Sequence, residues 1–280
     1  MAASALFAIL RRIGLRKALV LGAVLGVVYF LLPASLKQSV LAALTGGGAA
    51  TPAAGSGWSV CQVSAGNGQA CDFSRAVLAS TEDVWAGEFQ NGRLPQNDRS
   101  ATRYEQPTLV VFSEGVATAG CGSASSDVGP FYCPGDHKLY IDPNFYDVME
   151  QRLKAPGDFA QAYVIAHEVG HHVQNLIGSN ARSAPGDTKN QSSVRVELQA
   201  DCLAGVWGHT ARSSLKITDE DLREAVNAAH AIGDDALGQS RASNYTHGTS
   251  EQRMRWFRRG FDGGDARECD TFAVASYAQL

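Results

Sequence analysis

The segment from His167 to His171 constrains the fold of this chain more than any other, because it has the pattern His-Glu-x-x-His inside the helical run AYVIAHEVGHHVQNLI. Two histidines four residues apart on a helix lie about 40° apart around the axis and about 6 Å apart along it, so both imidazoles can bind one metal ion. Glu168 projects close to the same side, where it can accept the proton of a water molecule bound to the metal. The pattern therefore predicts a metal-binding helix that needs further ligands from elsewhere.

The segment VELQADC, residues 196–202, offers such ligands, because it contains two carboxylates four residues apart. Catalytic zinc commonly binds two histidines, one glutamate and a water, and a zinc-bound histidine usually donates its other N–H to a carboxylate. Glu197 fits the third ligand and Asp201 the carboxylate that orients a histidine. Acidic side chains on a helix most often face solvent. Here the neighbours Leu198 and Leu203 make the helix largely apolar, which favours the ligand interpretation.

The beginning of the chain predicts a membrane anchor. Basic residues at positions 11, 12, 16 and 17 precede an uncharged run over residues 18–36. A helix over this run would be about 28 Å long, near the thickness of a bilayer core, and the positive charges before it favour a cytoplasmic N-terminus. We therefore expect a cytoplasmic segment at 1–17, a transmembrane signal-anchor helix at 18–36, and the remaining chain outside the cytoplasm.

Residues 18–36 have two other possible interpretations. A charged segment before an apolar run is also typical of a cleaved signal peptide, but no small-x-small cleavage motif directly follows Leu32. A buried core helix is the other alternative, but Pro33 and the run TGGGAATPAAGSG separate this segment from any core. Residues 37–57 therefore predict a flexible Gly/Ala-rich linker. Residues 58–280 predict one domain, which is large enough to bury its own core.

All six cysteines follow the predicted anchor, and none forms a Cys-x-x-Cys motif. An even number of cysteines in an exported domain predicts a disulfide framework rather than a metal knuckle. Although fifteen pairings are possible, short loops favour Cys61–Cys71 and Cys121–Cys133, which leaves Cys202–Cys269 to fasten the C-terminal segment. Buried free thiols remain the alternative for each pair.

The periodicity of the domain predicts an α+β fold that is mostly helical with a small β-sheet. The β-rich run Thr108–Phe112 and a hairpin of Phe131–Cys133 with Lys138–Asp142 would form the sheet. Helices are expected at 74–91 with Ser74 as N-cap, at 158–177, from about 193 to 212, after Thr218 to 232, and after Thr249 or Ser250 through 257.

The sequence also resembles known families. HEVGHHVQ followed by ELQADC resembles the gluzincin arrangement of thermolysin-like and HtpX-like peptidases, whereas the metzincin pattern fails because Gln174 and Ile177 stand where it needs Gly and His. The wider run resembles the bacterial family of predicted neutral zinc metallopeptidases, which are membrane-anchored. This likeness covers most of Thr108–Phe272, including CGSASSDVGPFYCPGDHKLYID, AAHAIGDDALG and THGTSEQRMRWFRRGF.

This resemblance implies a zincin-like metallopeptidase domain that uses Zn²⁺ to hydrolyse a peptide or protein substrate. His167, His171 and Glu197 would bind the zinc, and Glu168 would be the general base. The segment THG adds His247, whose imidazole N–H would stabilise the developing oxyanion. An exposed loop histidine is the alternative interpretation of that residue.

Other function classes are less consistent with the sequence. A formal net charge of −4 provides no basic field for nucleic acid. A di-iron carboxylate bundle needs a second Glu-x-x-His, which the chain lacks. The remaining alternative to a hydrolase is a non-catalytic, membrane-tethered domain that binds zinc or acts as an adaptor.

Three further expectations concern residues around the motif. His172 lies about 100° around the helix from His171, which predicts a role beside a ligand or at the surface rather than ligation. Arg253 and Arg255 are interpreted as a basic helix face, with the orientation of a substrate or of an Asp/Glu partner as the alternative. The strand at Lys138–Asp142 is a hypothetical substrate-binding edge, since an extended peptide can add to a free strand edge.

Overall fold

The computed structural model describes residues 58–62 and 64–280, and the chain divides into two units, Met1–Ala53 and Ala54–Leu280. The predicted cytoplasmic segment at 1–17, the signal-anchor helix at 18–36 and the linker at 37–57 lie outside the described residues. Among the helices that are described, none is both long and apolar enough to span a bilayer.

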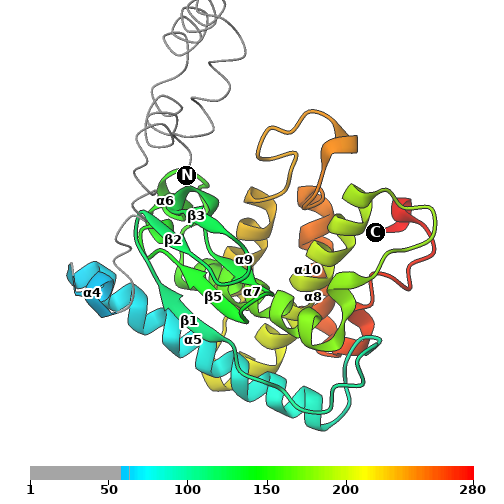
Figure 1. Ribbon diagram of the computed structural model, residues 1–280, viewed down its shortest axis with the longest axis horizontal. Helices are drawn as coiled ribbons and strands as arrows, with labels where there is room; N and C mark the ends of the chain where they lie inside the picture. The colour runs from blue at the N-terminus through cyan, green and yellow to red at the C-terminus, as the bar shows by residue number, and fades with distance from the viewer. Residues whose placement is uncertain (1–57, 63) are drawn as a thin grey trace, which may run out of the picture. The chain divides into compact units, whose positions relative to one another are not determined.

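The described residues are mostly helical with a small β-sheet, which confirms the predicted α+β class (Figure 1). The helices are α4 (Trp58–Cys61), α5 (Ala65–Gln90), α6 (Phe145–Gln151), α7 (Asp158–Ile177), α8 (Lys189–Leu215), α9 (Asp219–Ala231) and α10 (Ser250–Gly263). The strands are β1 (Thr108–Val111), β2 (Gly115–Ala117), β3 (Ser123–Ser125), β4 (Phe131–Cys133) and β5 (Lys138–Ile141).

The main sheet has the strand order β1-β5-β4. Strand β4 pairs with β5 in antiparallel register, with Tyr132 opposite Leu139, as the predicted hairpin requires. Strand β1 pairs with β5 in parallel register, with Leu109 also opposite Leu139. Because β5 is paired on both sides, the hypothesis that Lys138–Asp142 offers a free edge to a substrate is wrong. The edge strand that contacts the helix Asp158–Ile177 is β4.

Helix α7 carries the His-Glu-x-x-His motif and is buried on nearly every side, as expected for a helix with apolar residues all round. It packs against α5, α8 and α9. A Cβ atom on Gly170 would lie 2.9 Å from the carbonyl oxygen of Ala200 on α8, so glycine permits the close approach of the two helices. This approach places the turn that carries His171 next to the turn that carries Glu197.

The N-cap of α5 differs from the prediction. The helix starts at Ala65, and the side chain of Ser64 accepts the N–H of Asn67. The predicted cap, Ser74, lies buried inside the helix, where its hydroxyl donates to the carbonyl of Ala70 and shares a hydrogen bond with the hydroxyl of Tyr146. A serine can therefore serve helix packing as well as capping, and local sequence alone does not separate the two roles.

The three helices on the C-terminal side of the motif begin with capping boxes. Thr218 is the N-cap of α9, as predicted. Thr249, one of the two predicted candidates, is the N-cap of α10, which continues to Gly263 and not only to Phe257. Helix α8 starts at Lys189, earlier than expected, because Thr188 caps it together with Gln191.

The structure contains the disulfides Cys61–Cys71, Cys121–Cys133 and Cys202–Cys269, the same pairs that the loop lengths favour. The last of them connects α8 to the C-terminal segment, and the first two close short loops.

Helices α8 and α10 cross at glycines, which leads to a stability prediction. A Cβ atom on Gly260 would lie 1.9 Å from the carbonyl oxygen of Cys202, so alanine at this position must push the helices apart. Overpacking a core costs about 1–3 kcal/mol, which outweighs the gain of about 1 kcal/mol in helix propensity. We therefore expect Gly260→Ala to lower the free energy of unfolding, measured by urea denaturation. Gly87→Ala on α5 is the control, because no atom lies within 4 Å of its Cβ position and a small gain in stability is expected. Equal stability of the two variants would contradict this packing.

Candidate metal centre

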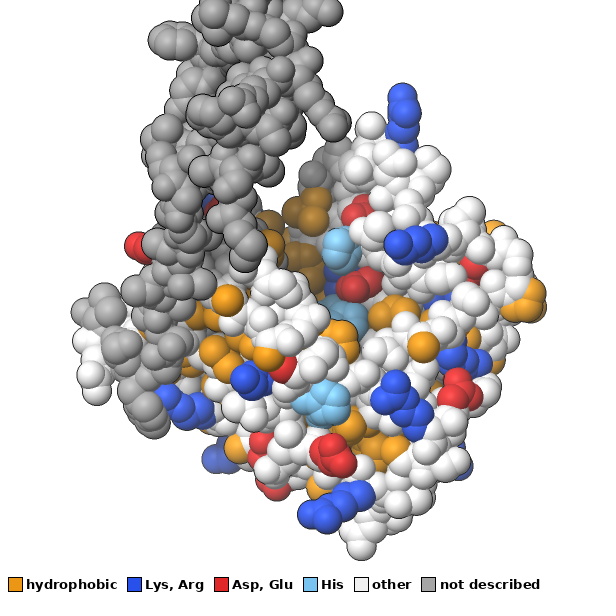
Figure 2. Space-filling model, in the orientation of Figure 1, with side chains coloured by type: hydrophobic (Ala, Val, Ile, Leu, Met, Phe, Trp, Pro, Cys, Tyr) orange, Lys and Arg blue, Asp and Glu red, His pale blue; other side chains and the backbone are white. Residues whose placement is uncertain are grey.

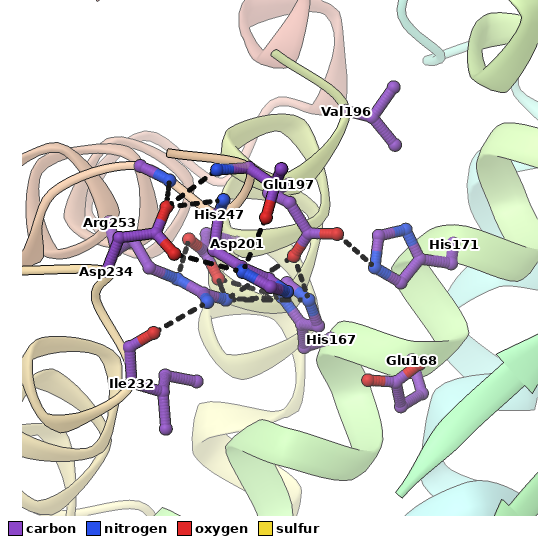
Figure 3. Close-up of polar contacts among 12 residues, drawn as sticks. His167, Glu168, His171, Val196, Glu197, Asp201, Ile232, Asp234, His247 and Arg253 are labelled. Carbon is purple, nitrogen blue, oxygen red and sulfur yellow. Dashed lines mark hydrogen bonds and ion pairs between the residues drawn. The ribbon is translucent and has the colours of Figure 1, made fainter. Parts of the chain in front are cut away.

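His167, His171 and Glu197 lie together, each offering one ligand atom, and these atoms are all within 4.8 Å of one another (Figure 3). The Nε2 atom of His167 lies 3.2 Å from one carboxylate oxygen of Glu197, and the Nε2 atom of His171 lies 3.4 Å from the other. A tetrahedral zinc ion bound at about 2.0–2.1 Å keeps its ligand atoms about 3.3 Å apart. The two separations therefore fit the ligand set of a zinc ion with a fourth position left for water.

The second ring nitrogen of each of these two histidines makes a hydrogen bond. The Nδ1 atom of His167 lies 2.8 Å from a carboxylate oxygen of Asp201, and the Nδ1 atom of His171 lies 2.8 Å from the side-chain oxygen of Gln174. Each oxygen accepts a hydrogen bond from the Nδ1–H group, so the lone pair of Nε2 faces the proposed metal position. Asp201 lies where the sequence predicts it. The role of Gln174 was missed, because a glutamine one turn after a histidine has no distinctive pattern.

Asp201 is held by a buried arginine. The Nε and Nη2 atoms of Arg253 each donate to the Asp201 carboxylate at 2.9 Å, and the hydroxyl of Tyr163 donates to it at 2.6 Å. Arg253 is only 2% exposed, so the interpretation as a basic helix face is wrong for this residue, and the alternative of an acidic partner is confirmed. Arg255 does lie at the surface, with Glu251 as its ion-pair partner.

The surroundings keep two carboxylates ionised. Burial alone would raise the pKa of Asp201, but the guanidinium of Arg253 and the ring of His167 lower it by more, so the net pKa lies below the ordinary value. For Glu197, burial is again outweighed, first by His171 and then by His167, and its pKa lies well below the usual range. Two anionic carboxylates beside two imidazoles suit a divalent cation.

Glu168 stands apart from this network (Figure 3). Its carboxylate accepts the backbone N–H of Tyr132, on β4, at 2.8 Å. Burial raises the pKa of Glu168 more than His171 and His167 lower it. A carboxylate with a raised pKa, close to the metal ligands but not among them, is suited to accept and return a proton.

His247 lies in the loop before α10 and borders the same pocket as the three candidate ligands. One oxygen of Asp234 accepts the backbone N–H groups of Thr246, His247 and Gly248 at 2.8, 2.8 and 3.0 Å. The other oxygen lies 3.3 Å from Nδ1 of His247. The structure thus brings His247 to the pocket and adds Asp234, which the sequence signalled only through the segment AAHAIGDDALG.

Comparison with known proteins agrees with this geometry. The sequence pattern of the family described as "Putative neutral zinc metallopeptidase" matches residues 11–272. The chain belongs to this family. Membership of the neutral zinc metallopeptidase family implies a zinc cofactor, and His167, His171 and Glu197 offer three donor atoms within 4.8 Å of one another to hold it.

Two relatives show how similar other members of the family are to this chain. "Uncharacterized protein YpfJ" of Escherichia coli strain K12 is 47% identical over 221 residues, which cover 75% of this chain and 74% of that protein. "Uncharacterized protein Rv2575" of Mycobacterium tuberculosis is 44% identical over 190 residues, which cover 61% of this chain and 64% of that protein. No solved structure matches the chain.

The pocket beside the candidate ligands has a volume of about 530 Å³. Figure 2 shows histidine and acidic side chains gathered in a hollow of this face, with hydrophobic side chains beside them. The volume falls within the range of about 300–1,000 Å³ that is usual for ligand pockets. The site can therefore admit a substrate to the candidate ligands.

His172, next to the candidate ligand His171, is fully buried. Its Nδ1 atom lies 2.9 Å from the hydroxyl of Tyr132, and its Nε2 atom lies 2.6 Å from the carbonyl oxygen of Glu105. As predicted, it does not belong to the ligand cluster. It connects α7 to β4, the strand whose backbone contacts Glu168.

The burial of His172 predicts a pH-dependent stability. Burial lowers the pKa of His172 from 6.5 to about 4. Between these values the unfolded state binds the proton and the folded state does not, so stability falls as the pH falls. A shift of this size corresponds to about 3 kcal/mol. From pH 7 to pH 4, wild-type protein should lose that much more unfolding free energy in urea than His172→Gln, which cannot titrate there. Parallel pH profiles would contradict this.

Proposed function

We propose that the protein is a zinc-dependent, endopeptidase-like hydrolase with a zincin-like domain that cleaves peptide bonds outside the cytoplasm. One observation carries the proposal. Two imidazole nitrogens and the carboxylate of Glu197 converge at the spacing of zinc ligands, while Glu168 stays free of that cluster beside the same pocket. A purely structural zinc site is closed by four protein ligands, whereas a catalytic site keeps one position open.

The residues of the candidate site have different roles in the proposed reaction. His167, His171 and Glu197 would hold the zinc, which when bound polarises the scissile carbonyl and lowers the pKa of its water. Glu168 accepts the proton of that water and passes it to the leaving amine. The N–H of Tyr132 keeps the Glu168 carboxylate in place. His247 donates an imidazole N–H to the developing oxyanion.

The proposed location follows from the charge pattern and the cysteines. Residues 18–36 would form the signal anchor with a cytoplasmic N-terminus, which leaves the metal centre on the other side of the membrane. Three disulfides support this proposal, because disulfides persist mainly in oxidising compartments.

The test uses purified full-length protein and a denatured protein mixture as substrate. Zinc content is measured by elemental mass spectrometry and new peptide ends by peptide mass spectrometry. We expect about one zinc per chain, cleavage that a chelator abolishes, and recovery when zinc is added back. A protein that binds zinc with high affinity and cleaves nothing would instead support the non-catalytic zinc-binding or adaptor domain.

A further inference from the structure

Next to the candidate zinc ligands, the pocket has an apolar wall that the proposed chemistry does not use. The wall is built from separate elements: α6, the loop after it, α7, the end of α9 and the loop that follows α9. Its side chains are Phe145, Val148, Leu153, Val164, Ile232 and Leu237. Such a wall can accept a nonpolar side chain and remove it from water, which is favourable in proportion to the area buried.

This wall lies within reach of a peptide held at the metal centre. Val164 precedes Glu168 by four residues on α7, which corresponds to about 6 Å along the helix axis on nearly the same face. Both residues line the pocket together with His167 and His171. A side chain of a residue that flanks the scissile bond can therefore contact the wall while the bond lies beside Glu168.

Exposed hydrophobic residues border the same pocket. Among the described residues, only Val128, Leu215 and Leu237 are large hydrophobic residues classed as exposed. Val128 is 60% exposed and Leu237 is 57% exposed, and both line the pocket. Nonpolar side chains at the rim of a nonpolar hollow are typical of a binding surface.

The charges of the pocket do not favour an acidic substrate side chain. Arg253 is the only arginine or lysine among the described residues that line it, and its guanidinium already binds Asp201. Asp127, Glu168 and Glu197 also line the pocket. An acidic side chain would therefore meet carboxylates and no arginine or lysine that is free to pair with it.

We propose that this pocket selects substrates with a large nonpolar side chain, such as leucine or phenylalanine, on a residue that flanks the scissile bond, and that it rejects acidic side chains there. This specificity rests on the proposed peptidase function, because it assigns the substrate class of the same site. It adds that the apolar wall determines which substrate side chain the site accepts.

Binding to an inactive variant tests the specificity without relying on turnover. Full-length Glu168→Gln protein, with its zinc content verified, is titrated with blocked fluorescent peptides that differ at one position: Leu, Phe, Ala or Glu. A nonpolar pocket discriminates about tenfold or more per methylene group. We therefore expect the Leu and Phe peptides to bind at least about tenfold more tightly than the Ala peptide, and the Glu peptide to bind most weakly. Equal affinities would overturn the proposal.

Variants of the apolar wall test whether its side chains cause the preference for nonpolar peptides. In the same background, Val148→Phe fills the pocket and should weaken binding of the Phe peptide about tenfold, with less than about a threefold effect on the Ala peptide. Leu237→Ala removes an exposed part of the wall, so it tests the pocket without disturbing the core. It should reduce the preference for Leu and Phe over Ala. Leu215→Phe is the control, because Leu215 is exposed on α8 and does not line this pocket. Unchanged selectivity in both wall variants would refute the assignment.

Hydrolysis by the wild-type protein separates the two proposals. If peptides bind selectively but zinc-loaded wild-type protein cleaves none of them, the peptidase function fails and the binding specificity stands. If all peptides are cleaved with equal kcat/KM, the peptidase function stands and the specificity fails.

Discussion

Replacing Glu168 by glutamine is expected to lower kcat for peptide hydrolysis by about 10²–10⁴-fold, the usual contribution of a general acid-base residue, while the zinc content stays unchanged. The glutamine oxygen can still accept the N–H of Tyr132, so the side chain should keep its position. What it loses is the ability to take a proton from water and return it to the amine. Because Glu168 is outside the cluster of candidate ligands, zinc binding should not suffer.

The measurement combines initial rates on a peptide with elemental analysis of the same preparations. Glu150→Gln makes the same chemical change at an exposed position on α6 and serves as the control. Glu197→Gln should behave differently from both, because it removes a candidate ligand and should lower zinc affinity as well as activity. If Glu168→Gln retained zinc and more than a tenth of the wild-type rate, Glu168 would not be the general base.

The parts of the centre that could be predicted are those that depend on spacing along one helix. His167 and His171 share a face of α7, and Glu197 and Asp201 share a face of α8. Each pair is fixed by helical geometry once the helix is recognised. The caps at Thr218 and Thr249 are equally local, because each interacts with a residue three positions on.

The parts that could not be predicted depend on contacts between distant segments. The parallel pairing of β1 with β5 covers the strand edge that the sequence presents as free, and no local pattern indicates it. Arginine is seldom buried, which favours a basic helix face for Arg253 over the alternative of an acidic partner. A signal was present, however, since Arg253 shares a helix face with Trp256 and Phe257, which are buried. An arginine within an apolar stripe indicates a buried carboxylate partner, which here is Asp201.

Replacing Arg253 by methionine is expected to lower the free energy of unfolding by about 3–5 kcal/mol, the usual cost of removing one partner of a buried ion pair. The Asp201 carboxylate is fully buried, and without the guanidinium it would keep only the hydrogen bonds of Tyr163 and His167. Urea unfolding should be measured with a chelator present, so that bound zinc adds no stability. Arg255→Met, at an exposed position on the same helix, should change stability by less than about 0.5 kcal/mol.

The double variant Arg253→Met with Asp201→Asn distinguishes the loss of an ion pair from a simple loss of packing. Removing the buried charge together with its partner should restore part of the stability, so the effects of the two substitutions should not add. Asp201→Asn alone should also weaken zinc binding by about 10–100-fold, because the carboxylate orients His167. If the double variant were as unstable as the sum of the single variants, Arg253 would stabilise the core only by filling space. If Arg253→Met were as stable as Arg255→Met, the buried ion pair would contribute nothing to the free energy of unfolding.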